Sequence, residues 1–346
     1  MNGFGLDNLP YAVVDGRCVV RYGDELLALA PLDPVFDAPT LNPFLAAGRA
    51  KWEAIRERVV ALLEAGNADL EPLTDAPQLP IAIGDYVDFY SSIEHATNIG
   101  RMFRPEEPLL PNYRHLPIGY HGRAGSIVVS GTPVIRPHGQ RPDFGPTEKL
   151  DVEVELGFVT GAGKPLGAPI ATREARDHVF GFVLVNDWSA RDLQRWEYQP
   201  LGPFLAKSFA TSISPWIVPL AALEPYLVPA REQDPEPLPY LRTTGSWALD
   251  LELELALNDT VISRMNARGL YWTFPQQLAH ATVNGAAVRP GDLFASGTIS
   301  GPEPGTEGSL IELGRPFLAD GDTVTITGSA GSVSFGEVRG TIVPAG

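Results

Sequence analysis

Two stretches of the chain alternate acidic and apolar residues, the pattern of a β-strand with one acidic face. The first carries carboxylates at Asp151, Glu153 and Glu155, and the second at Asp250, Glu252 and Glu254. Successive side chains of a strand point to opposite faces, so the carboxylates of each stretch share one face. Such carboxylates can converge on one hard cation, which prefers oxygen ligands. The alternative is a half-buried strand with a solvated acidic face, and spacing alone does not decide which strand, if either, binds a metal.

Two further aspartates lie beside other polar side chains. Asp88 lies in the segment YVDFYSS, and His95 follows seven residues later. Asp187 comes after the apolar run 179–185, so its carboxylate is expected at the end of a buried strand, where sites are commonly built. Taken singly, each aspartate is more simply explained as a turn or helix cap. No pair among the six histidines has HExxH spacing, and the chain has no GxSxG nucleophile elbow.

The composition favours a scaffold of short strands for these residues. Glycine and proline number 35 and 33 of 346 residues, and without a collagen period so many turn formers favour strands joined by ordered loops. The sequence predicts strands within residues 11–31 and at 127–129, 150–159, 179–185, 216–218, 249–257 and 323–327. One long helix is expected from an Asn42 cap to Gly66, and a second over 264–281. A polar, proline-bearing stretch at 67–80 places a domain boundary near residue 84.

The charge of the chain excludes several classes of partner. Its 26 basic and 42 acidic residues give a net charge of −16, which disfavours binding to nucleic acid or anionic membranes. Cys18 is the only cysteine, so no intrachain disulfide or thiolate zinc cluster can form. The N-terminus has no signal-peptide pattern, and the apolar runs are too short to span a bilayer. A cytoplasmic location is therefore expected.

Several long segments, in order along the chain, resemble the fumarylacetoacetase family. They lie at 86–104, 116–133, 150–158, 186–216, 233–241, 289–301 and 320–328. Smaller acylpyruvate hydrolases of the same superfamily lack the YxDFYSSxxHATN and WEYxPLGPFxxKSF segments that this chain has. The resemblance implies a mostly β (α+β) fold, with an SH3-like barrel and one helix in residues 1–84 and a mixed β-sandwich roll as catalytic domain in 85–346. It also implies a homodimer.

The resemblance further implies an activity and the residues that carry it. The expected reaction is metal-dependent hydrolysis of the carbon–carbon bond of 4-fumarylacetoacetate to fumarate and acetoacetate, the last step of tyrosine and phenylalanine breakdown. The implied ligands of the metal are Asp88, Glu153, Glu155 and Asp187, with a second cation contact at Asp187, Lys207 and Thr211. The implied catalytic residues are the general base His95, its orienting partner Glu312, and the polar groups Arg191, Gln194 and Lys207. The implied substrate contacts are Tyr90, Arg104, Tyr120, Gln194, Tyr198 and Thr298.

Four carboxylates are hard ligands, so Ca²⁺ or Mg²⁺ is expected and zinc is not. The strand with Asp250, Glu252 and Glu254 matches no ligand of the family and is expected to be solvated. Ala210 stands where the family commonly has glycine, which puts the local backbone and the second cation contact in question. Two alternatives remain: hydrolysis of an acylpyruvate or another 1,3-diketo acid, or a calcium-stabilised β-sandwich binding module with no catalytic activity.

Overall fold

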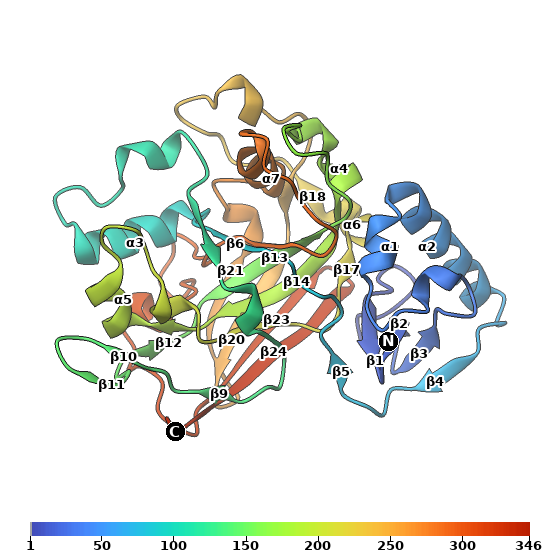
Figure 1. The fold of residues 1–346 in the computed structure, drawn as a ribbon, viewed down its shortest axis with the longest axis horizontal. Helices are drawn as coiled ribbons and strands as arrows, with labels where there is room; N and C mark the ends of the chain where they lie inside the picture. Colours follow the sequence, from blue (N-terminus) through green and yellow to red (C-terminus); the bar gives the residue numbers. More distant parts are fainter. Residues whose placement is uncertain (1) are drawn as a thin grey trace.

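Two large β-sheets form the centre of the molecule, which the computed structural model describes for residues 2–346 (Figure 1). The eight-stranded sheet has the order β7-β6-β22-β13-β14-β16-β8, with β17 also paired to β14. Its strands are β6 (Tyr86–Phe89), β7 (Gly119–Gly122), β8 (Ile127–Val129), β13 (Val154–Thr160), β14 (Val179–Asp187), β16 (Thr211–Ile213), β17 (Val218–Pro219) and β22 (Leu293–Ala295). The five-stranded sheet consists of β9 (Val134–Ile135), β20 (Glu252–Leu257), β21 (Thr260–Asn266), β23 (Thr323–Ala330) and β24 (Val333–Val343).

The two sheets pack face to face through apolar side chains. β14 contacts both β23 and β24, and Phe182 and Leu184 on β14 share one buried cluster with Ile326 and Val338 of the other sheet. The alternate residues of β14, Val183 and Val185, belong to a second buried cluster on the opposite face. β14 is therefore buried on both faces, which explains its continuous apolar sequence.

The first part of the chain forms a separate five-stranded sheet against that second face (Figure 1). Its order is β4-β3-β2-β1-β5, with β1 (Tyr11–Val14), β2 (Arg17–Tyr22), β3 (Glu25–Ala28), β4 (Leu70–Pro72) and β5 (Pro77–Gln78). Phe180 contacts the rings of Tyr11, Phe44 and Trp52, and the backbones of Tyr11 and Ile217 exchange two hydrogen bonds. The boundary at residue 84 and the SH3-like form of the first unit stay predictions.

Helices and short strand pairs cover the sheets. The helices are α1 (Asn42–Ala46), α2 (Arg49–Glu64), α3 (Ile93–Phe103), α4 (Ala175–His178), α5 (Arg191–Glu197), α6 (Leu220–Leu223), α7 (Phe274–Thr282) and α8 (Leu310–Leu313). The pairs are β10 (His138–Gln140) with β11 (Phe144–Pro146), β12 (Leu150–Asp151) with β15 (Ser189–Ala190), and β18 (Leu227–Val228) with β19 (Ala248–Leu249). None of the helices in the described part of the chain has the length and hydropathy that a membrane span requires.

The fold class predicted from the sequence is confirmed, but two helix predictions are wrong in part. The long helix is divided, because Gly48 adopts a positive φ of 81° between α1 and α2. The helix expected over 264–281 is shorter: β21 continues to Asn266, and α7 begins only at Phe274, after a Thr273 cap. The apolar residues at 265–272 are buried by packing without forming a helical face, so their spacing gave a false helical signal.

Candidate active site

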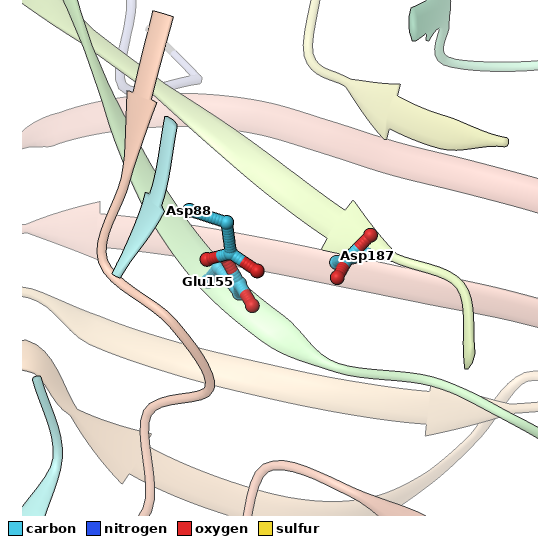
Figure 2. Close-up of side chains that lie close together, drawn as sticks. All are labelled: Asp88, Glu155 and Asp187. Atoms are coloured by element: carbon cyan, nitrogen blue, oxygen red, sulfur yellow. The ribbon is translucent and has the colours of Figure 1, made fainter. Parts of the chain in front are cut away.

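Three carboxylates from separate strands of the large sheet converge (Figure 2). Asp88 lies on β6, Glu155 on β13 and Asp187 at the end of β14, and ligand oxygens of the three lie within 4.8 Å of one another. The side chains are buried, with residue exposures of 2%, 0% and 0%. The register brings them together, since Asp88 pairs with Ala295, whose other neighbour is Gly157 of β13. Apolar side chains of Val183, Val185 and Leu293 pack over Gly157.

The two acidic stretches of the sequence have opposite surroundings. All seven residues of β13 are buried, so a solvated acidic face is wrong for this stretch. On β20, in the five-stranded sheet that also contains β21, β23, β24 and β9, Glu252 is exposed and Glu254 pairs with Arg264 at the surface. The structure thus confirms that the second stretch is solvated, because one face of its sheet is open to water.

The strand expected over 150–159 is also interrupted, and its three carboxylates do not share one face. β12 ends at Asp151 and pairs with β15, whereas β13 starts at Val154. Asp151 and Glu153 therefore lie outside the converging group. A break of two residues releases the strict alternation on which the expectation depended.

The cluster has the properties of a cation site. Burial, followed by repulsion from the neighbouring carboxylates, raises the pKa of Asp88 and of Glu155 well above the usual values. Among residues 2–346, three of the buried oxygens with no hydrogen-bond partner belong here: Asp88 Oδ1 and both carboxylate oxygens of Glu155. Buried polar atoms rarely lack partners. Unpaired carboxylate oxygens in a buried cluster fit a hard divalent cation.

Two basic side chains pair with Asp187 of this cluster and with Glu153 beside it. The Glu153 carboxylate accepts from Lys207 Nζ and lies 2.7 Å from Arg191 Nη1. Burial alone raises the pKa of Glu153, but Lys207 and Arg191 outweigh it and hold that pKa well below the usual value. Asp187 accepts from Lys207 Nζ at 2.6 Å and from Thr211 Oγ1 at 3.1 Å. The four expected metal ligands therefore divide into two with cationic partners and two without.

These hydrogen bonds limit how Lys207 could take part in the second expected cation contact. The Lys207 ammonium has no lone pair for a cation, so such a contact would need its backbone oxygen. Ala210 does not need the freedom of glycine, because the non-glycine residues with positive φ in the described chain are Leu9, Asp15, Asn258 and Asp259.

A histidine and a glutamate form a hydrogen-bonded pair near the carboxylates. His95 lies in the first turn of α3, where Ser92 Oγ accepts from its backbone N–H. Its Nδ1 lies 2.6 Å from Glu312 Oε2 on α8. Burial raises the pKa of Glu312, but His95 and the hydroxyl and amide donors outweigh it and lower the pKa to about 2. Since Nδ1 is engaged, Nε2 remains for a water molecule.

A cavity of about 510 Å³ connects these groups. Its walls include the carboxylates of Asp88 and Glu153 together with the polar residues His95, Arg191, Gln194 and Lys207. All the expected substrate contacts line it as well, namely Tyr90, Arg104, Tyr120, Gln194, Tyr198 and Thr298. Arg104 Nε, Arg191 Nη2 and Thr298 Oγ1 are buried without partners, so they are free to bind a polar ligand. Glu155, Asp187, Thr211 and Glu312 lie behind this wall.

Some residues of the site were not found from the sequence. Glu312 also accepts from Asn98 at 3.0 Å, Ser300 at 3.0 Å and Ser309 at 2.6 Å. Asn98 lies three residues after His95 in the matching HATN segment, and on a helix that spacing places both on one face, which was an available signal. Ser300 and Ser309 carried no signal in the sequence.

Comparisons with known proteins find relatives over the whole length of the chain. The family "Fumarylacetoacetate (FAA) hydrolase C-terminal" matches residues 86–343, and "Fumarylacetoacetase N-terminal" matches 7–83. The fumarylacetoacetases of Rattus norvegicus and Arabidopsis thaliana are each 45% identical to this chain over 99% of its length and 96% of theirs. That of Homo sapiens is 44% identical over the same shares.

Solved structures share the fold at lower identity. A fumarylacetoacetate hydrolase from Exiguobacterium antarcticum superimposes with a TM-score of 0.66 at 18% identity, over 97% of this chain and 99% of its own. A maleylpyruvate hydrolase from a Sphingobium species, in complex with manganese(II) and pyruvate, gives 0.64 at 20%, over 97% and 100%. The full-length matches to catalysts exclude a non-catalytic calcium-binding module, and the chain belongs to the fumarylacetoacetase family.

Proposed function

We propose that this chain hydrolyses 4-fumarylacetoacetate to fumarate and acetoacetate, the last step of tyrosine and phenylalanine breakdown. Fumarylacetoacetases at this identity over the whole chain support the reaction. The observation that carries the mechanism is that His95, Arg191, Lys207 and Asp88 all line one cavity of about 510 Å³. A base, donors for an oxyanion and a carboxylate of the acidic cluster can thus reach a single ligand.

Asp88 and Glu155 would hold a divalent cation, with Asp187 and Glu153 completing the ligand set. The carboxylates of Asp88 and Glu155 lack cationic partners, so their combined charge matches that of one Ca²⁺ or Mg²⁺ ion. When bound, the cation would supply Lewis-acid polarisation of the diketone oxygens of the substrate. It would also offset the repulsion between a dianionic substrate and a chain of net charge −16.

The first step is attack of water on the carbonyl carbon next to the fumaryl group. His95 Nε2 takes a proton from the water, and Glu312 stabilises the resulting imidazolium through Nδ1, 2.6 Å away. The imidazole must therefore carry its neutral-state proton on Nδ1. The four donors around the Glu312 carboxylate keep it ionised and oriented for this task.

The second step breaks the carbon–carbon bond of the resulting tetrahedral alkoxide. Arg191, with its unpaired Nη2, would donate to the alkoxide oxygen together with Gln194 and Lys207, which line the same cavity. The electron pair of the broken bond leaves with the acetoacetate carbon, which then takes up a proton. The carbonyl carbon keeps the oxygen of water and becomes a carboxylate of fumarate.

Residues that line the cavity would determine the length of substrate that the site accepts. Arg104 has a buried Nε without a partner and can bind a terminal carboxylate, and Tyr90, Tyr120, Tyr198 and Thr298 line the same cavity. This arrangement favours the long substrate over acylpyruvates, whose carboxylate lies next to the diketone.

We also propose that the protein is a cytoplasmic homodimer. Each chain would consist of two domains, residues 1–84 and 85–346. Exposed apolar side chains near the cavity mouth support an interface, since Leu201 is 95% exposed and Phe204 61%. Sedimentation velocity at micromolar concentration tests the dimer, and a monomer would contradict it.

A direct assay tests the function. Purified protein should release fumarate from fumarylacetoacetate, lose the activity after treatment with a chelator, and regain it with Mg²⁺ or Ca²⁺. Absence of turnover with both metals would contradict the proposal.

A further inference from the structure

One buried carboxylate of the catalytic unit has no role in the mechanism above. Asp151, at the end of β12, is 0% exposed. Its Oδ1 accepts from the backbone N–H groups of Val152 and Leu310, each at 2.8 Å. Its Oδ2 accepts from Arg191 Nε at 2.8 Å and from the N–H of Ile311 at 3.4 Å. Both oxygens are therefore satisfied, and neither faces a cation.

These bonds connect two parts of the reaction centre that are far apart in the sequence. Leu310 and Ile311 begin α8, the turn that carries Glu312 and so sets the position of His95. Arg191 is the first residue of α5 and lines the cavity. Asp151 accepts hydrogen bonds from both, so one side chain links the turn that carries Glu312 to the start of α5.

The bond from Asp151 also controls how Arg191 can point. Nε donates to Asp151 and Nη1 lies 2.7 Å from Glu153, which leaves Nη2 as the free nitrogen. A guanidinium is planar, so fixing two of its nitrogens fixes the direction of the third. Without the Nε bond, the guanidinium would be held only through Nη1, by Glu153 and by Gln194 Oε1 at 3.3 Å.

We propose that Asp151 is a positioning residue, which holds the Arg191 guanidinium in a fixed place relative to α8 so that Nη2 donates to the alkoxide. The inference rests on the proposed role of Arg191. Asp151 itself does not touch the substrate.

The chain offers a matched control. Asp250 occupies the same place in the second acidic stretch, but it bonds to Asn266 Nδ2 at 2.7 Å and lies 3.5 Å from Arg268 at the surface. Asp151→Asn keeps Oδ1 for Val152 and Leu310, while its amide NH₂ faces Arg191 Nε, a donor, so that bond is lost. Asp250→Asn makes the same chemical change without contact to the site.

The test is a double-mutant cycle in kcat between Asp151→Asn and Arg191→Gln. Intact sites are counted in each sample by calorimetric titration with Mg²⁺ alone. Arg191→Gln is expected to lower kcat by about 10²–10³, as for loss of one oxyanion donor. Asp151→Asn should lower kcat by about 10–10²-fold, with KM within about threefold, because a displaced donor is lost mainly to the transition state.

In the Arg191→Gln background, Asp151→Asn should change kcat by less than about threefold, since the donor it positions is already absent. Asp250→Asn should leave kcat unchanged. A residue that merely supports the fold would lower kcat by the same factor in both backgrounds, and this result would overturn the proposal. Wild-type kcat in Asp151→Asn would do so as well.

The outcomes also separate this inference from the proposed function. If Arg191→Gln keeps wild-type kcat, the role proposed for Arg191 is wrong, and the inference falls with it. If Arg191→Gln is slow but Asp151→Asn is not, the inference alone fails. If Asp151→Asn does not fold, the double variant, which removes both buried charges, is compared with Arg191→Gln, and a further loss beyond about tenfold contradicts the proposal.

Discussion

Replacement of Glu155 by glutamine should separate the two functions of the acidic cluster, metal affinity and charge repulsion. Ligand oxygens of Glu155, Asp88 and Asp187 lie within 4.8 Å of one another. At an effective dielectric constant of about 20, two unit charges at that separation repel by about 3 kcal/mol. A divalent cation among the three gains at least a comparable energy from each carboxylate, so losing one charge should weaken binding by about 10²-fold or more.

The effect on stability should have opposite signs without and with metal. With chelator present, Glu155→Gln should leave the melting temperature unchanged or raise it, because a buried like charge has been removed. At a Mg²⁺ concentration of about 100 times the wild-type Kd, bound metal stabilises the wild type by about 2.7 kcal/mol. The variant, at about its own Kd, should gain only about 0.4 kcal/mol.

The measurements are calorimetric titration with Mg²⁺ and thermal melts with and without the ion, in parallel with Glu252→Gln as control. Glu252 is exposed on β20, and a surface change there should alter stability by less than about 0.5 kcal/mol. A Glu155→Gln protein that keeps the full metal-dependent gain would refute the assignment of the cluster. Equal losses in the two variants would refute it too.

Three further predictions concern the chemistry. His95→Ala should lower kcat by about 10²–10⁴ with substrate binding largely retained, and near wild-type turnover would mean that another group activates the water. Fumarylacetoacetate should have a much higher kcat/KM than acylpyruvates; if acylpyruvates react faster, specificity follows the smaller relatives despite the 196–204 segment. Because the pKa of Glu312 falls from 4.5 to about 2 on folding, its ionisation contributes on the order of 3 kcal/mol above pH 4.5, and that contribution is lost as the pH drops toward 2. The unfolding free energy of wild type minus Glu312→Gln, from urea titrations at pH 6 and pH 3, should shrink at pH 3, and a constant difference would contradict the assignment.

The sequence predicted the strand-rich fold because its strands carry local signals. β14 reads as a continuous apolar run, and the run ends at Asn186 and Asp187, which are buried as well. Helix limits were less predictable, since the break at Gly48 depends on its positive φ, and Met265, Tyr271 and Trp272 are buried by tertiary contacts without forming a helix.

The site was predictable to the extent that its residues lie in matching segments. Alternation could not distinguish Glu155 from Glu254, because that difference arises from what covers each sheet. Ionic pairing was also invisible: nothing local indicates that Glu153 binds Lys207, 54 residues away, or that Asp151 reaches Leu310, 159 residues away. Such contacts depend on topology, which short-range patterns do not encode.

The apolar contact between the first sheet and β14 has a consequence for how the protein loses activity. Val183 and Val185 face the N-terminal unit, and Asp187 continues the same alternate row of β14. Glu155 pairs directly with Val185, so it lies on that face as well. The acidic cluster thus lies at one end of this face of the eight-stranded sheet, and the N-terminal unit packs against the other end.

We therefore expect the packing of the N-terminal unit to restrain the end of β14, although the described contacts of the cluster include none of its residues. A small residue in place of Trp52 would weaken the apolar contact with Phe180 of β14. The end of β14 would then fluctuate, and the three carboxylates would move apart. Substitutions in the contact between the first sheet and β14 would then weaken metal retention while the catalytic residues themselves stay intact. Added divalent metal would stabilise such variants, because a bound cation holds together the strand ends that the weakened apolar contact no longer restrains.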